Sequence, residues 1–324
     1  MAPFVTKSLQ AGGKLIPLIL DSKDTNGTAL FNPSIYIDGE RALVNIRHCQ
    51  YTFYHSEKKI FPHEFGPLLY LNPEDDITLT TTNYIGELGP NYEMVKYTKI
   101  DTTKFDKKPV WQFIGLEDGR LVRWDGDLCL FGVRRDTKPN GEGRMERTLL
   151  NESFHEIDRW RIPAPGANDT YCEKNWMPIL DWPNHFVKWC NPLEIVRIDP
   201  VKRTCETVLT KPMNVAHSYR GGSQVLRIGD YYVTLTHTVR LWFTESQRKD
   251  AIYMHSFLVW DKDWNFIKAT REFSFMGALV EFACGMAVHN DRVLISFGYQ
   301  DNCAFILNSS KEFILNYIER DPGE

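Results

Sequence analysis

The chain has 324 residues, of which 43% are hydrophobic, 13% aromatic and 25% charged, and its formal net charge is −4. This composition is that of an ordinary globular protein, and the small negative charge excludes a general attraction to nucleic acid or to an anionic membrane. Since no run of about 18 apolar residues and no apolar signal segment occurs, we expect no membrane contact.

The seven cysteines are scattered along the chain and include no Cys-x-x-Cys pair. This pattern is typical of small buried side chains in a reducing compartment, so we expect a cytoplasmic protein, in the host cytoplasm if the chain is viral. The histidines lack metal-ligand spacing, and no glycine-rich nucleotide-binding motif or P-loop is present. We therefore expect neither a metal nor another cofactor.

Short stretches of alternating apolar and polar residues dominate the chain, and sustained helical periodicity is nearly absent. Five times, a segment with polar residues is followed by a turn signal and a strongly apolar strand. The polar openings begin near residues 31, 116, 173, 219 and 280, and the apolar strands span 41–46, 127–133, 185–189, 231–236 and 292–297. Repeated strand pairs with loops of variable length are typical of propellers. We predict an all-β protein, a single five-bladed β-propeller domain over residues 1–324, in which 311–319 is compatible with a short C-terminal helix.

In such a fold the five openings face one central axis, so their polar residues converge into one pocket. The first opening contains Asn32, and the strand that follows it contains Asn45 and Arg47. Amide and guanidinium groups are suited to hydrogen bonds with sugar hydroxyls. For Asn32 the alternative is the capping of a turn.

The second opening contains Asp118, the leading candidate for a catalytic residue, beside Glu117 and Arg120. Arg120 is two residues from Asp118 and therefore lies on the same face of the strand. A carboxylate beside an arginine ionises easily, as a general base requires, whereas burial would favour a general acid. The alternative is a structural Asp–Arg pair that closes a turn.

Several cations fall at the openings or at the ends of the strands that follow them: Arg134 or Arg135, Lys174, Arg220 and His237. A group of positive side chains around a pocket is suited to a phosphate or pyrophosphate. Each cation taken alone is equally compatible with a surface position or with pairing to a neighbouring acid.

The remaining candidates for sugar binding carry polar or aromatic side chains. They are Glu117, Arg120, Asn175, Trp176, Tyr219, Gln224, Glu281 and Asp301. Aromatic rings stack on the faces of sugar rings, but packing in the propeller core is the alternative for Trp176 and Tyr219.

Four short motifs, at 117–121 (Glu-Asp-Gly-Arg-Leu), 173–175 (Glu-Lys-Asn), 220–224 (Arg-Gly-Gly-Ser-Gln) and 281–286 (Glu-Phe-Ala-Cys-Gly-Met), carry a family resemblance. In this order they resemble the five-bladed β-propeller enzymes of the mannoside-phosphorylase group, the related mannosyltransferase/phosphorylases, and glycosyltransferase-like proteins of viruses and phages. The resemblance covers roughly residues 30–305. It implies a catalytic role for Asp118 and phosphate binding by Arg134 or Arg135, Lys174 and His237. The chain departs from the family at Gly119, where a proline or larger residue is common, and at Trp176.

These observations predict a glycosyltransferase that moves a sugar from a phosphate-containing donor, a nucleotide sugar or a sugar 1-phosphate, to a hydroxyl acceptor. Asp118 would act as the base, or as the acid in the direction of phosphorolysis. The acceptor is a sugar or a polymer, and a modified nucleic acid stays open.

Three alternatives remain. The first is a glycoside phosphorylase acting on mannosides. The second is an inverting glycosidase, which would need Glu281 or Asp301 as a second carboxylate and has little use for the cations. The third is a non-catalytic sugar-binding propeller.

Overall fold

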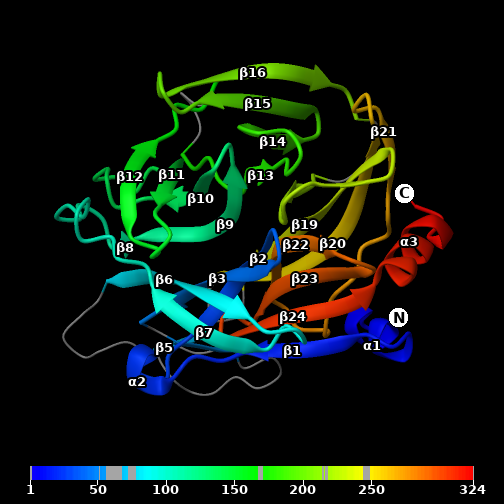
Figure 1. Cartoon of the computed structure of the whole chain (residues 1–324), viewed down its shortest axis with the longest axis horizontal. Helices are drawn as coiled ribbons and strands as arrows, with labels where there is room; N and C mark the ends of the chain where they lie inside the picture. The colour runs from blue at the N-terminus through cyan, green and yellow to red at the C-terminus, as the bar shows by residue number, and fades with distance from the viewer. Residues whose placement is uncertain are drawn as a thin grey trace.

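The computed structural model describes residues 2–50, 52–55, 68–71, 78–166, 171–213, 215, 218–243 and 249–323, with the strands at 52–55 and 68–71 described by their backbone alone. Five β-sheets of four or five strands surround a central axis (Figure 1). The predicted five-bladed β-propeller is therefore confirmed, and the predicted openings and apolar strands form the first strands of the five blades.

The blades follow one another along the chain. The first contains β2 (Leu30–Asp38), β3 (Arg41–Cys49), β6 (Leu79–Leu88), β7 (Met94–Lys99) and the short β8 (Phe113–Ile114). The second contains β9 (Leu116–Trp124), β10 (Asp127–Arg134), β11 (Arg144–Leu150) and β12 (Glu156–Arg161). The third contains β13 (Met177–Pro178), β14 (His185–Cys190), β15 (Leu193–Asp199) and β16 (Thr204–Lys211). The fourth contains β17 (Arg220–Gly221), β18 (Leu226–Ile228), β19 (Tyr231–Phe243), β20 (Lys249–Asp261) and β21 (Phe266–Ala269).

The fifth blade contains strands from both ends of the chain: β22 (Glu281–His289), β23 (Arg292–Tyr299), β24 (Cys303–Ser310) and β1 (Lys14–Leu18). β1 pairs antiparallel with β24, with Leu15 opposite Leu307. The N-terminal strand thus becomes the outer strand of the last blade. This pairing ties the last blade to the start of the chain and holds the ring closed.

Apolar side chains fill the spaces between neighbouring blades, because each strand alternates its side chains between its two faces. Among the described residues, five of the six clusters of buried apolar side chains lie between blades, one for each pair of adjacent blades. The cluster between the first and second blades has nine buried members, whereas the others have 11 to 18. This interface therefore contains the least apolar packing of the five.

Three short helices complete the described part of the chain: α1 (Phe4–Gln10), α2 (Ser22–Thr25) and α3 (Lys311–Arg320). α3 confirms the short C-terminal helix. Ser310, the residue before it, caps the helix, because its side chain accepts a hydrogen bond of 3.1 Å from the Phe313 N–H, and the helix buries Ile314 and Ile318. None of these helices is long and apolar enough to cross a membrane.

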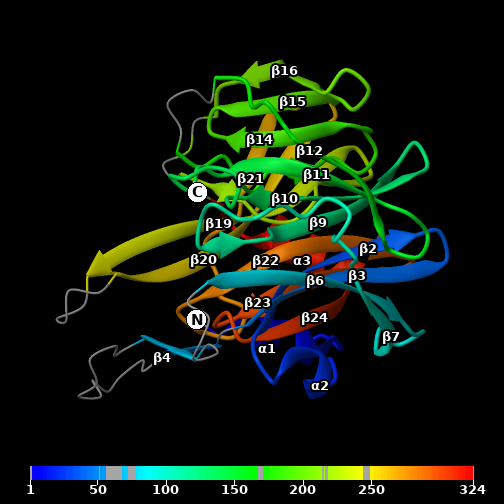
Figure 2. The same ribbon diagram turned by 90° about the vertical axis from the view of Figure 1, so that its left-hand side faces the viewer.

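Two hairpins project from the same side of the propeller (Figure 2). One is formed by the long strands β19 and β20, and the other by β4 (Thr52–His55) and β5 (Leu68–Leu71). The start of β2 pairs with the end of β3, and β17 pairs with β19 at His237, so both hairpins extend from the blade end that carries the polar openings. The hairpins flank this end of the axis.

Candidate active site

In each of the first three blades, a residue in the inner strand or just before it adopts the left-handed region of backbone conformation. These are Asn32, Asp118 and Asn175, with φ values of 48°, 52° and 62°. In the first two blades, the strand register also shifts at this point, as in a β-bulge. Asn and Asp adopt positive φ more readily than other non-glycine residues, and bulges re-aim side chains near functional sites. The sequence thus turns one polar side chain per blade toward the axis.

These side chains meet across the blades. Asn32 Nδ2 donates a hydrogen bond of 2.8 Å to Asp118 Oδ1, and Arg47 Nη1 donates one of 2.9 Å to the same oxygen. Asp118 is 7% exposed. Burial alone would raise its pKa, but the charges of Arg47 and Arg120, the Asn32 hydrogen bond and the charge of Lys174 lower it to about 2. Asp118 is therefore a buried carboxylate that is ionised at neutral pH.

Arg47 positions Asp118 and connects it to the outer part of the first blade. Its Nε donates a hydrogen bond of 3.2 Å to Thr81 Oγ1, and its Nη2 lies 3.6 Å from Glu117 Oε2. The guanidinium lies 4.7 Å from the centre of the Phe31 ring. Arg47 is thus fixed from three directions, which holds its positive charge at the carboxylate.

Arg120 has a different environment, because its guanidinium donates hydrogen bonds to backbone carbonyl groups. It donates hydrogen bonds of 3.0 and 2.8 Å to the Gly222 carbonyl and one of 2.7 Å to the Asp118 carbonyl, and it is 1% exposed. A Cβ at Gly222 would lie 2.4 Å from the Leu235 carbonyl oxygen, so only glycine fits there. Arg120 therefore joins the second and fourth blades, and its contribution to the site is its charge.

Lys174 and Arg220 are exposed cations at the third and fourth openings. Neither has an ion-pair or side-chain hydrogen-bond partner among the residues whose placement is described. Lys174 lies close enough to lower the pKa of Asp118, and both cations help to lower the pKa of the buried His237. Lys174 therefore supplies uncompensated positive charge beside Asp118, and Arg220 supplies it beside His237, as an anionic group requires.

His237 is a neutral side chain at this site. Burial lowers its pKa well below the ordinary value, and the nearby His255, Lys174 and Arg220 lower it further. Its ring stacks on Tyr253, with ring centres 5.5 Å apart. His237 can therefore offer a polar atom to a ligand but no charge at neutral pH.

Tyr253 belongs to the site, although it was not among the sequence candidates. Burial raises its pKa to about 12, with further contributions from the negative charges of Asp301 and Asp118. It lies on β20, the third strand of the fourth blade, where its ring packs against that of His237. No local pattern in the sequence marks this position.

Asp301 is the second carboxylate beside the axis. It lies in the turn between β23 and β24 with a φ of 48°, and no other described residue donates a hydrogen bond to it. Burial raises its pKa to about 6 against the charges of Arg47 and Lys174, and the negative charge of Asp118 adds to the rise. Asp301 and Asp118 thus have pKa values that are shifted in opposite directions.

The structure places several of the predicted residues in architectural positions. Trp176 and Tyr219 are buried in the core at 0% and 2% exposure. Gln224 is bonded to three blades besides its own, and the carboxylate of Glu281 accepts hydrogen bonds from the N–H groups of Phe275, Met276 and Ala278. These four side chains are therefore not free to contact a sugar.

Three other predicted residues are bonded within the protein. Asn45 donates hydrogen bonds to Asn83 Oδ1 and to the Gly119 carbonyl. Arg134 faces away from the axis, where its Nε donates a hydrogen bond of 2.6 Å to Glu146. Arg135 donates one to the Tyr171 hydroxyl and lies over the Phe113 ring. Of the proposed donor-binding cations, the structure thus brings Lys174 and Arg220 to the axis with free charges.

No group of three or more His, Cys, Asp or Glu residues suited to a metal ion occurs in the described ranges. No family model matches the sequence, and no curated protein matches it.

Solved structures with this fold do match. A mannose phosphorylase from Leishmania mexicana in complex with phosphate ion is similar at 13% identity, over 96% of this chain and 93% of that chain, with a TM-score of 0.51. A GDP-Man-dependent mannosyltransferase from the same organism is similar at 12% identity, over 96% and 92%, with a TM-score of 0.51. A glycosyl hydrolase from Bacteroides ovatus is similar at 10% identity, over 88% and 85%, with a TM-score of 0.53. At this level of identity, the similarity establishes that the chain shares the propeller fold of these three proteins.

Proposed function

We propose that the protein is a glycosyltransferase that uses a sugar donor with a phosphate group, such as a sugar 1-phosphate or a nucleotide sugar, and a hydroxyl acceptor. One observation carries the proposal. An ionised, buried Asp118 lies beside Lys174, and Arg220 lies at the neighbouring His237; neither cation has a partner among the described residues. A carboxylate that accepts a proton and cations that bind a departing phosphate are the two groups this reaction needs.

The reaction balances with these groups. The acceptor oxygen forms a bond to the anomeric carbon of the donor while its proton passes to Asp118. The bond between the anomeric carbon and the phosphate oxygen breaks, and the phosphate leaves with the electron pair toward Lys174 and Arg220. Phosphorolysis of a glycoside is the same step in reverse, with protonated Asp118 as the acid.

Binding of a donor would change the pKa of Asp118. A phosphate bound at Lys174 and Arg220 adds negative charge nearby, and an occupied site excludes water from the carboxylate. Both effects raise the pKa of a carboxylate. Donor binding would therefore make Asp118 a stronger base at the moment the acceptor is present.

Two of the similar structures are a mannose phosphorylase and a GDP-Man-dependent mannosyltransferase, so mannose 1-phosphate and GDP-mannose are the first donors to test. We would measure the melting temperature with phosphate, mannose 1-phosphate, GDP-mannose and mannose, since a ligand that binds the folded state raises it. A larger rise with either donor than with mannose is expected, together with turnover when an acceptor is added. No response to any phosphate-containing compound would contradict the proposal.

Asp301 supports a second candidate function, an inverting glycosidase. Two carboxylates with pKa values of about 2 and about 6 provide a base and an acid at the same site. The two uncompensated cations favour the transferase. Release of free sugar from a mannoside in phosphate-free buffer, with no stimulation by added phosphate, would support the glycosidase instead.

A further inference from the structure

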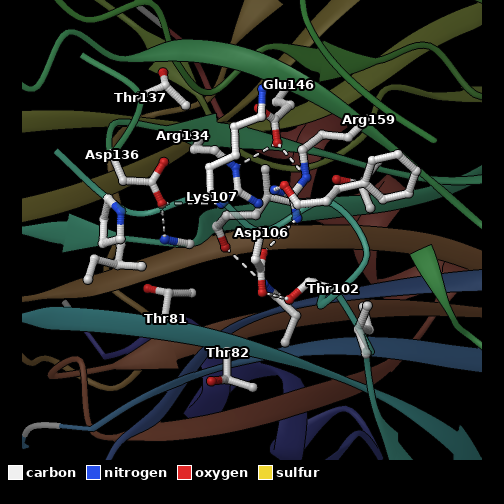
Figure 3. Close-up of a pocket in the computed structure, with 18 of the residues that line it drawn as sticks. Thr81, Thr82, Thr102, Asp106, Lys107, Arg134, Asp136, Thr137, Glu146 and Arg159 are labelled. Atoms are coloured by element: carbon white, nitrogen blue, oxygen red, sulfur yellow. Dashed lines mark hydrogen bonds and ion pairs between the residues drawn. The ribbon is translucent and has the colours of Figure 1, made fainter. Parts of the chain in front are cut away.

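A cavity of about 1020 Å³ lies between the first and second blades (Figure 3). Its volume is at the upper end of the roughly 300–1,000 Å³ typical of small-molecule sites. It is lined by parts of β6 and β7 in the first blade, by parts of β10 and β11 in the second, and by the loop that joins β7 to β8. The lining includes none of the axis residues Asp118, Lys174, Arg220, His237 and Asp301. The cavity is therefore distinct from the candidate active site.

A layer of buried side chains separates the cavity from the axis. Thr81 accepts a hydrogen bond of 3.2 Å from the Nε of Arg47, and Asn83 donates one of 2.9 Å to the Leu116 carbonyl. Thr81, Arg47 and Asn83 are all buried. Because these hydrogen bonds hold the layer in place, a ligand in the cavity does not reach Asp118. Any ligand of the cavity is therefore bound independently of the reacting groups.

The three arginines that line the cavity each pair with a carboxylate. The pairs are Arg134 with Asp136 and Glu146, Arg159 with Asp106, and Arg161 with Glu142. Figure 3 shows the bonds of Arg134 and Arg159 as dashed lines. The fourth carboxylate of the lining, that of Asp101, accepts hydrogen bonds from the N–H and the hydroxyl of Thr103. The arginines and carboxylates of the lining are therefore already bonded within the protein.

Three lysines of the lining differ from these arginines. Lys99 is the last residue of β7, and Lys107 and Lys108 lie in the loop that joins β7 to β8. All three are exposed, and their side chains have no ion-pair or hydrogen-bond partner among the residues whose placement is described. The charge in this cavity that is free to bind a ligand is therefore positive.

Several free lysines suit a phosphate group better than a carboxylate. A phosphate monoester carries about −1.5 to −2 charges at pH 7, whereas a carboxylate carries a single charge, and lysine binds phosphate as a point charge. Apolar side chains that are partly or fully exposed also line the cavity, among them Phe105, Val110 and Ile114. A cavity of this size holds a molecule much larger than a phosphate ion, so these side chains can contact an organic group attached to the phosphate.

We propose that this cavity is a second binding site, separate from the axis, for a small phosphorylated organic molecule. Its phosphate would lie at Lys99, Lys107 and Lys108, and its organic part would lie against Phe105 and Val110. The inference goes beyond the proposed function and does not depend on it, since no residue of the axis takes part.

The test is calorimetric titration of the whole protein with AMP, glucose 6-phosphate, adenosine and citrate. The titrations use Lys174→Ala, in which binding at the axis is weakened. At least one of the two phosphorylated compounds should bind, and adenosine and citrate should bind much more weakly. When Lys107→Ala and Lys108→Ala are added, the affinity should fall roughly ten-fold or more, because hydrogen bonds to a charged group are lost.

The matched control adds Lys202→Ala and Lys262→Ala to Lys174→Ala instead. These changes remove the same number of charges at exposed turn positions of the third and fourth blades, so the affinity should stay as in Lys174→Ala. The melting temperature of both triple variants should be unchanged, since only exposed side chains are shortened.

Four results would overturn the inference. The first is that neither AMP nor glucose 6-phosphate binds, and the second is that both triple variants bind with equal affinity. The third is that adenosine or citrate binds as tightly as the phosphorylated compounds. The fourth is binding that is present in the unaltered protein and lost in Lys174→Ala, which would assign the phosphate to the axis alone.

Discussion

Two groups of polar residues lie around the same axis, and their hydrogen bonding separates them. Arg120, Gln224 and Glu281 are buried and fully bonded to backbone or side-chain groups, often in other blades. Lys174 and Arg220 are exposed and have no partner in the part of the chain that the structure describes. Both groups come from the blade openings, so the position along the repeat does not distinguish an architectural residue from a reactive one. The two kinds of residue differ in whether their hydrogen-bonding groups are already occupied by other groups of the protein.

Asp118 shares features of both groups, since it is buried and bonded but also proposed to react. Its substitution should give the largest effect of the predictions made here. Asp118→Asn keeps an oxygen that can accept the hydrogen bonds from Asn32 and Arg47, so the fold and donor binding should persist. Turnover should fall by roughly 10²–10⁴-fold, because the proton acceptor is lost. Steady-state rates and calorimetric titration of the donor would separate the two effects. Unchanged turnover would exclude a catalytic role.

Gln224 tests the architectural group. Its Nε2 donates to Ser34 Oγ and to the Leu121 carbonyl, and its Oε1 accepts from the Met286 N–H. Gln224→Ala would leave these buried groups without partners and should lower the free energy of unfolding by about 3 kcal/mol. Urea denaturation followed by fluorescence would measure the change. Gln112→Ala, at an exposed position, should leave stability nearly unchanged, and equal stability of both variants would remove the distinction drawn above.

Lys174 tests the second group, the exposed cations without a partner among the described residues. Lys174→Ala should weaken the binding of mannose 1-phosphate by roughly ten-fold, the usual effect of one hydrogen bond to a charged group, and should leave stability intact. Lys202→Ala, at an exposed lysine in the turn before β16, is the control. Equal losses for mannose and mannose 1-phosphate would argue against a phosphate site at this position.

Asp301 gives the smallest effect, and it depends on pH. Its pKa is about 6 in the folded protein and 3.8 in its ordinary state, so the folded protein holds the proton more tightly. Ionisation therefore reduces stability as pH rises from about 4 to about 6, and the loss is complete above that window. Asp301→Asn should accordingly stabilise the protein by about 1 kcal/mol at pH 7.5 and hardly at all at pH 4. Equal differences at both pH values would contradict the raised pKa.

Much of the architecture follows from the sequence alone. The alternation in 41–46 and 292–297 predicts strands that the structure contains as β3 and β23, and the five openings predict the number of blades. Asp118 stands out by its neighbours in the chain. The closure of the fifth blade by β1 and the contribution of Tyr253 from β20 have no comparable local signal, since both depend on residues far apart in sequence.

The sequence by itself determined where strands and turns form, because backbone preference and side-chain alternation act within a few residues. Only the tertiary structure decided which polar side chains remain free. Arg134 and Lys174 both look like phosphate ligands in the chain, yet Glu146 neutralises the first and no described residue neutralises the second. The charge available to a ligand depends on neighbours that folding brings together across blades. It therefore cannot be predicted from any single segment of the sequence.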